Sequence, residues 1–221
     1  MELYYLITIS DRDRAEMLSA IYHAAGTGMV LTKLGRGTAT GEQLSFYGLD
    51  ATEKAVVSTV ADAEQTRQIF RAAKRKLFID IPGNGVMMAI PLKSVAGGRT
   101  LGFLTDSTQT GGKPAMDFSH ELIMAIMNEG YSDTVMDAAR SAGAGGGTVL
   151  HAKGTGRARA EKFFGVSLAD EKDVVYIVAH AEEKAAIMQA IADNAGPGTR
   201  AGAICFSLPI SQVAGLRERD E

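Results

Sequence analysis

The chain has 221 residues, of which 46% are hydrophobic and 22% are charged, and its formal net charge is −3. This balance is typical of an ordinary globular protein, and the lack of a basic excess argues against a nucleic-acid partner. No apolar run approaches the roughly 18 residues that a membrane span requires, so we expect no membrane span.

Cysteine, histidine and the amino terminus exclude further classes of protein. The single cysteine, Cys205, cannot form a disulfide within the chain, and its apolar surroundings indicate a core thiol. The four histidines have none of the spacings of a metal site, so we expect no structural zinc. The first ten residues lack the basic region and apolar core of a signal peptide. We therefore expect a cytoplasmic location.

Hydrophobic periodicity predicts six elements in the first part of the chain. Strands are expected at Leu3–Ile9, Met29–Leu34, Ala55–Ala61 and Val86–Leu92. One helix is expected to follow Asp13, which stands three residues before Glu16, and the other to follow Asp62, which stands three residues before Gln65. Both spacings are those of a capping box. The second helix should bury a stripe made of Ile69, Phe70, Ala73 and Leu77.

The same order returns after a polar, glycine-rich linker at Gly98–Asp117. Strands are expected at Glu121–Met127, Gly147–Lys153, Asp173–Ala179 and Ala203–Pro209. Helices are expected near Ser132–Ala142 and Glu182–Asn194. The second half of the chain is therefore predicted to repeat the first.

The amino-acid sequence itself shows this duplication. Three blocks recur in the same order, 118 or 119 residues apart: Val30–Ala39 with Val149–Ala158, Val56–Glu64 with Val174–Glu182, and Ala89–Gly98 with Ser207–Leu216. A repeat of this kind indicates two copies of one unit. We predict domains at residues 1–97 and 118–217, joined by a linker at 98–117.

The predicted fold class is α+β, as two tandem ferredoxin-like βαββαβ sandwiches. Each copy should form a four-stranded antiparallel sheet with both helices on one face. The other face stays apolar, and we place Ile7, Val57 and Val60 or their neighbours on it. Such a face implies that one unit packs on another.

Two long connections are the first candidate functional elements. They join the second and third strands of each copy, at Gly35–Lys54 and Gly154–Lys172. Hairpin loops normally have two to five residues, so long loops at the same place in both copies favour a function over a tolerated surface excursion.

Two glycine-rich segments could receive an anion. Gly145–Thr148 precede a strand that ends with Lys153, and Arg157 follows; glycine N–H groups beside cations suit a phosphate. The segment Gly196–Gly202 contains Arg200, and its glycines would allow close approach of a ligand or serve only as a helix stop and tight turn.

No set of residues resembles a catalytic centre. Asp170, Glu171 and Asp173 surround Lys172, a pattern more typical of a solvated loop than of an acid and base pair. His151 lies inside a predicted strand, where a structural imidazole is the simpler reading. We expect a protein that is not an enzyme.

The order of elements and several strings resemble the nitrogen regulatory protein P-II (PII-like) family. The string GTVLHAKGTGR at Gly147–Arg157 is similar to the family's second strand, EKFFGVS at Glu161–Ser167 occupies its T-loop, and Gly196–Ile210 resembles its B-loop and last strand. The first copy resembles the family more faintly, at Gly28–Gly37.

The resemblance implies a trimer that holds ATP, ADP or AMP in clefts between domains, although no cofactor is certain. Carried over onto this sequence, the ligand-binding residues would be Thr148, Lys153, Gly154, Gly156, Arg157, Gly198 and Gly202. The B-loop lysine of the family falls near Ala203, and Arg200 could replace it. In the first copy Arg36 is kept, whereas Met29 stands where the second has Thr148.

The resemblance therefore predicts a PII-like signal-transduction protein that senses a small anionic effector at inter-domain clefts and regulates a partner protein through its T-loops. Two alternatives stay open. One is a trimeric metal-binding or stress protein of the same fold, and the other is a protein-interaction module without a ligand.

Overall fold

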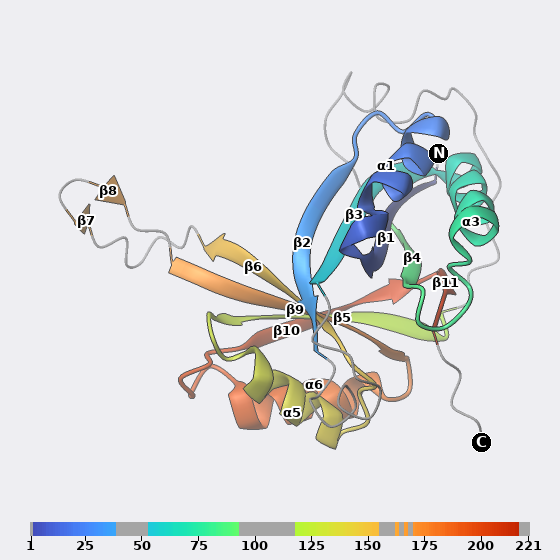
Figure 1. Ribbon diagram of the computed structural model, residues 1–221. Helices are drawn as coiled ribbons and strands as arrows, with labels where there is room; N and C mark the ends of the chain where they lie inside the picture. The colour runs from blue at the N-terminus through green and yellow to red at the C-terminus, as the bar shows by residue number, and fades with distance from the viewer. Residues whose placement is uncertain are drawn as a thin grey trace. The chain divides into compact units, whose positions relative to one another are not determined.

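The computed structural model describes residues 2–38, 53–92, 118–154, 162–163, 166–167 and 170–216 (Figure 1). The chain divides into two compact units. Unit 1 consists of Met1–Leu34, Glu53–His120 and Pro209–Glu221, and unit 2 of Gly35–Thr52 and Glu121–Leu208. The predicted linker Gly98–Asp117 lies outside the described residues, and its limits and those of the two domains stay predictions.

Unit 1 contains the predicted β-α-β-β-α-β order. Its elements are β1 (Leu3–Asp11), the 3-10 turn η1 (Arg12–Arg14), α1 (Ala15–Ala24), β2 (Leu31–Gly37), β3 (Glu53–Asp62), α3 (Ala63–Leu77), β4 (Val86–Pro91) and β11 (Gln212–Ala214). The strands lie in the order β2-β3-β1-β4-β11, and β1 is antiparallel to both neighbours. Helices α1 and α3 lie on the same side of the strands (Figure 1).

The two helix starts predicted in unit 1 had different outcomes. At α3 the capping box is confirmed, because Asp62 accepts a hydrogen bond from the Gln65 backbone at 2.9 Å and the Gln65 side chain accepts one from the Asp62 backbone at 3.1 Å. The capping box at Asp13 is wrong. Asp13 lies within η1, and Arg14, at the N-cap of α1, makes no side-chain capping bond. The tight turn moves the helix start beyond the predicted cap.

The core of unit 1 lies between its helices and its sheet. The predicted stripe of α3 is buried there, with Ile69, Phe70, Ala73 and Leu77 all in one cluster. Tyr22 is fully buried, its hydroxyl lies 2.5 Å from that of Thr8, and burial raises its pKa. The prediction for Val57 was wrong: Val57 pairs with Thr8 and packs in this same cluster rather than on the opposite face.

Unit 2 repeats the same order of elements. They are β5 (His120–Asn128), α5 (Ser132–Ser141), β6 (Thr148–Gly154), the short pair β7 (Lys162–Phe163) and β8 (Val166–Ser167), β9 (Asp170–His180), α6 (Lys184–Ala195) and β10 (Ile204–Ile210). The strands lie in the order β10-β5-β9-β6, and α5 and α6 cover one face (Figure 1). The predicted βαββαβ fold class is confirmed.

The core of unit 2 also lies between its helices and its sheet, and it is built mainly from aliphatic side chains. Ile123, Val175, Ile177, Ile187 and Ile191 are buried between sheet and helices. Cys205 is partly buried and packs against this cluster, and burial raises the pKa of its thiol. The predicted core thiol therefore lies at the margin of the core rather than inside it.

Each sheet gains a strand from a distant part of the sequence. In unit 1, β11 pairs with β4, so that Val213 lies opposite Met88. In unit 2, the last residues of β2 pair with β6, so that Arg36 lies opposite Val149 and Gly37 opposite Thr148. Gly35 is required at this pairing, because a Cβ there would lie 2.6 Å from the Val149 carbonyl oxygen. The first predicted loop therefore begins after β2 rather than at Gly35.

Candidate ligand-binding site

One edge of unit 2 holds the turn between α6 and β10, which we call the Gly196–Gly202 turn. Asn128, the last residue of β5, fixes this turn through its backbone N–H to the Ala201 carbonyl and its side-chain amide to the Arg200 carbonyl, both at 2.9 Å. The Lys172 ammonium donates to the Asn128 side-chain oxygen at 2.6 Å. The Arg200 backbone is therefore held in place while the residue itself is exposed.

The glycines of this turn have different roles. A Cβ at Gly196 would lie 2.1 Å from the Ala192 carbonyl oxygen, and Gly202 has a φ of +56°. Both are therefore required by the helix stop and the tight turn. Gly198 has a negative φ and nothing within 4 Å of a Cβ, so packing does not require glycine there and its exposed backbone is open to a ligand.

The base of the second predicted T-loop lies across the same edge. Lys153 and Gly154 are the last two residues of β6, and they pair with Glu171 and Asp170. Lys172 pairs with Ala152 and bonds Asn128. This chain of contacts joins β6 to the Gly196–Gly202 turn. Gly156 and Arg157, also predicted to bind ligand, lie outside the described residues.

The other two predicted site residues lie at the opposite end of β6. Thr148 is buried and stands six residues before Gly154, which places the two about 20 Å apart along the strand. Arg36, in the neighbouring strand β2, pairs with Val149 of β6, and its guanidinium lies 4.0 Å from the Asp133 carboxylate. The predicted residues therefore form two groups, with Lys153, Gly154, Gly198, Arg200 and Gly202 in one and Thr148 and Arg36 in the other.

Of the glycines before β6, Gly147 is used by the fold, whereas Gly145 and Gly146 have nothing within 4 Å of a Cβ. The Gly147 N–H donates to the Thr38 hydroxyl at 2.8 Å, and the Gly147 carbonyl accepts from the Thr38 backbone and hydroxyl. The Arg140 guanidinium donates to the Thr38 carbonyl. Gly147 is thus engaged by Thr38, and it lies at the opposite end of β6 from Lys153. No local sequence pattern reveals a pair that is separated by more than 100 residues.

A second polar group at this unit joins His151 to Asp173. The His151 Nδ1 lies 2.7 Å from one Asp173 oxygen, and the Gly130 backbone donates to the other at 3.0 Å. The Asp173 side chain is only 2% exposed, whereas that of His151 is 65% exposed. The expectation of a solvated loop was therefore wrong for Asp173, which lies inside β9 opposite His151. The carboxylate holds His151 in one orientation, as expected for a structural imidazole.

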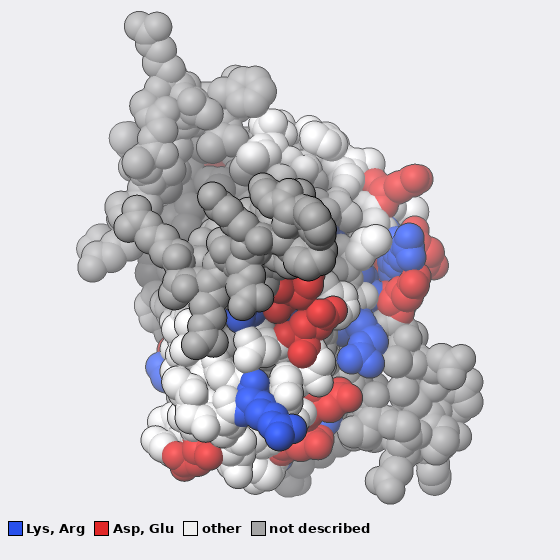
Figure 2. All heavy atoms as spheres, turned by 90° about the vertical axis from the view of Figure 1, so that its left-hand side faces the viewer, with Lys and Arg blue, Asp and Glu red and all other residues white. Residues whose placement is uncertain are grey.

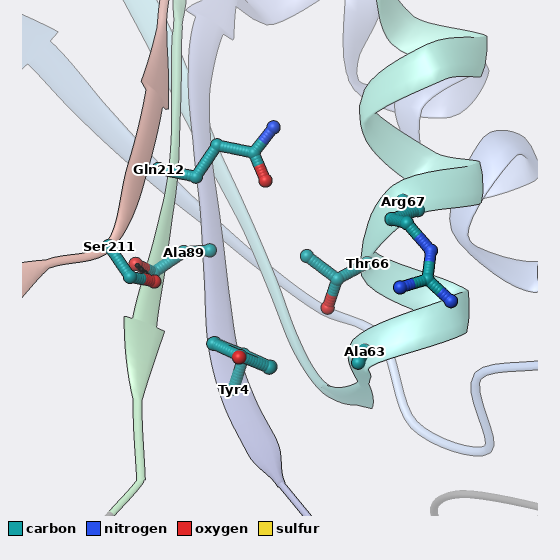
Figure 3. Close-up of a pocket in the computed structure, with 7 residues that line it drawn as sticks. All are labelled: Tyr4, Ala63, Thr66, Arg67, Ala89, Ser211 and Gln212. Carbon is teal, nitrogen blue, oxygen red and sulfur yellow. Dashed lines mark hydrogen bonds between the residues drawn. The ribbon is translucent and has the colours of Figure 1, made fainter. Parts of the chain in front are cut away.

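Unit 1 contains a hollow of about 250 Å³ that the sequence did not indicate (Figure 3). It is lined by Tyr4, Ala63, Thr66, Arg67, Ala89, Ser211 and Gln212. Arg67 is paired with Glu64 and holds the pKa of that carboxylate below its usual value. The Ser211 hydroxyl donates to the Ala89 carbonyl at 3.0 Å. Because its cation and this hydroxyl already have partners, the hollow is a weaker candidate than the edge of unit 2.

Neither the face shown in Figure 2 nor the metal-ligand pattern of the described residues adds a competing site. On the face shown in Figure 2, basic and acidic side chains lie interspersed among the residues that are described. Within the described parts of the chain, no three His, Cys, Asp or Glu side chains are grouped to hold a metal ion. None of the helices described is long and apolar enough to cross a membrane.

Comparison with known proteins identifies the second copy. The family model of the nitrogen regulatory protein P-II matches residues 120–220. These residues form a PII-like domain. It contains the Gly196–Gly202 turn and the end of β6, so the resemblance drawn from the sequence is confirmed for this copy. For the first copy, membership stays a prediction that the repeated order of elements in unit 1 supports.

A solved structure and the curated proteins complete the comparison. The crystal structure of Arabidopsis thaliana PII bound to citrate is 21% identical, with a TM-score of 0.34, over 43% of this chain and 78% of that chain. Among curated proteins, no match was found.

Proposed function

We propose that the protein is a PII-like regulatory protein that senses a small anionic effector at the Lys153–Arg200 edge of unit 2 and changes a partner contact through its T-loops. The PII-like domain at residues 120–220 supports a regulatory role, and we propose that this role is not enzymatic. Binding energy at such an edge can order an adjacent loop, which is a common switching device.

The observation that carries this proposal is the pair of hydrogen bonds from Asn128 to the Gly196–Gly202 turn. Asn128 holds the backbone at Arg200 and Ala201, so the turn is preorganised while the Arg200 residue stays exposed. A side chain that projects from a fixed backbone loses less entropy on binding than one on a mobile backbone. Gly198 adds an exposed backbone with no packing demand on it.

Arginine at this turn favours a phosphate-bearing effector. Its planar guanidinium can donate two parallel hydrogen bonds to a phosphate or carboxylate. An adenine nucleotide, ATP, ADP or AMP, is therefore the proposed class of effector, with Arg200 in place of the lysine that the PII family has near Ala203. We propose that the cleft is completed between domains of a cytoplasmic homo-oligomer, with a trimer as the expected state.

Ligand-induced thermal stabilisation tests this function directly. We expect a rise in Tm with at least one of ATP, ADP, AMP, 2-oxoglutarate or bicarbonate, because a ligand that binds only the folded state stabilises it. Arg200→Ala should weaken binding about tenfold to a hundredfold, the usual loss for a charge-assisted hydrogen bond. Arg157→Ala should weaken it as well.

Arg12→Ala is the matched control, since Arg12 is an exposed arginine of unit 1 that pairs with Glu53. It should leave affinity unchanged. Unchanged affinity in both Arg200→Ala and Arg157→Ala would discard this edge as the site. No stabilisation by any of the five compounds would favour the alternative of a protein-interaction module, which the alanine at position 203 supports.

A further inference from the structure

Helix α3 of unit 1 concentrates positive charge on its exposed face. Its basic residues are Arg67, Arg71, Lys74, Arg75 and Lys76, all exposed, and its only acidic residue is Glu64. Helix α6, which holds the same place in unit 2, has one basic and one acidic residue, Lys184 and Asp193. The charge is therefore a property of this copy and not of the fold.

Four of these cations form one stripe along the helix. Arg67, Arg71, Lys74 and Arg75 follow the spacing i, i+4, i+7 and i+8, which places them within an arc of about 100°. Glu64 pairs with Arg67 alone. Among the described residues, Arg71, Lys74 and Arg75 have no ion-pair partner within 4.0 Å, although the Glu64 carboxylate also interacts with Arg71 at longer range.

Two exposed apolar side chains stand at the carboxyl end of this stripe. Phe78 is 58% exposed and Ile81 is 53% exposed. Phe78 also has a φ of +51°, the only non-glycine residue in the described chain with a positive φ. A bulky residue rarely adopts this conformation, and glycine would occupy it without strain. An exposed, strained phenylalanine contributes little to the core, which argues for a role outside it.

The turn that carries these side chains is fixed. The Ile81 N–H and the Asn84 side-chain amide both donate to the Phe78 carbonyl at 3.0 Å. The Arg14 guanidinium donates to the Asn84 carbonyl at 3.2 Å. Phe78 and Ile81 are therefore presented by a braced turn beside the last turn of α3.

We propose that this face of α3, with Phe78 and Ile81 at its end, binds an anionic lipid surface. A cluster of four to eight cations on an amphipathic helix is attracted to anionic headgroups, and an adjacent aromatic side chain can enter the interfacial layer. The apolar pair favours a lipid surface over duplex nucleic acid, whose bases are already stacked and whose outer surface offers phosphates to the cations but no contact to Phe78 and Ile81. The contact is peripheral, because the apolar stripe of α3 is committed to the core.

Vesicle flotation of the full chain tests the proposal. The vesicles are phosphatidylcholine alone and equal parts of phosphatidylcholine and phosphatidylglycerol, each at low and high salt. We expect flotation with the anionic vesicles only, and its loss at high salt as charges are screened. Arg71→Glu should reduce the bound fraction about tenfold, since each cation near the surface contributes to attraction. Lys33→Glu, an equal change of charge at an exposed lysine of β2, should reduce it far less.

Phe78→Gly separates binding from folding. It removes the apolar side chain and relieves the positive φ, so we expect a higher Tm together with weaker flotation. Equal flotation with neutral vesicles would overturn the proposal, and so would equal effects of Arg71→Glu and Lys33→Glu. Retention on duplex DNA or on an acidic peptide without any flotation would overturn it in favour of a polyanion site.

Discussion

The turn before the last strand of the βαββαβ order is packed in unit 1 and exposed in unit 2. In unit 1 the turn at Pro82–Gly85 is closed, because Asn84 is engaged by Arg14 and a Cβ at Gly215 would lie only 2.0 Å from the Gly85 carbonyl oxygen. In unit 2 the Gly196–Gly202 turn is held from one side by Asn128, and Arg200 stays exposed. One βαββαβ plan therefore yields a turn used for packing in one copy and a turn open to a ligand in the other.

A substitution at Gly215 should disrupt the packing of the unit 1 turn. Gly215→Ala should destabilise unit 1 by about 2–4 kcal/mol, because a Cβ at a φ of +88° is both strained and overlapped by the carbonyl oxygens of Gly85 and Ile79. Gly198→Ala, where nothing lies within 4 Å, should change stability by less than about 0.5 kcal/mol.

Chemical denaturation measures both variants, and hydrogen exchange at β4 and β11 locates the change. Equal stabilities of the two variants would show that the close contact of Gly215 with Gly85 does not hold the unit 1 turn in place. The comparison between a structural and an open turn would then fail.

The polar pairing in unit 2 offers a second contrast. Asp173 is buried and accepts from His151 and Gly130, whereas Ala55, 118 residues earlier, is buried without any polar side chain. Asp173→Ala should cost about 1–3 kcal/mol, because it leaves the Gly130 N–H without its acceptor and releases His151. Unit 2 should therefore not tolerate the residue that unit 1 has.

Asp133→Ala is the control for that substitution, since its side chain is 85% exposed and 4.0 Å from Arg36. We expect a change below about 0.5 kcal/mol in the free energy of unfolding. A loss at Asp173→Ala no larger than this would mean that the buried carboxylate has no stabilising role.

The fold was predictable because its determinants are local. The α3 stripe, the Asp62 cap and the βαββαβ order of elements follow from periodicity and short spacings, and the structure has them. The pairings of β11 with β4 and of β2 with β6 were not predicted. The prediction of a cap at Asp13 was wrong for an equally local reason. A 3-10 turn, whose hydrogen bonds span three residues, occupies Arg12–Arg14, and a capping box has the same three-residue spacing in the sequence.

The long-range contacts at the candidate site and elsewhere in the two units were not predictable from such patterns. Thr38 meets Gly147, Asn128 meets Arg200, and Ser211 meets Ala89, pairs that are separated by 72 to 122 residues. Each depends on the register in which distant segments meet. The sequence could assign Gly198 and Gly202 to one turn. Only the backbone shows that the conformation of the turn requires glycine at position 202 and that packing does not require it at position 198.

The helix starts give the smallest expected difference between the units. At α3, Asp62→Ala should cost about 1 kcal/mol, because the N-cap oxygen that accepts from Gln65 is lost. At α6, Glu183 occupies the N-cap position without a side-chain capping bond, so Glu183→Ala should cost helix α6 less than Asp62→Ala costs α3. Thermal denaturation of both variants checks this. A loss at Glu183→Ala as large as that at Asp62→Ala would show that α6 is also stabilised at its start by a side chain, and that the two units differ in their turns but not in their caps.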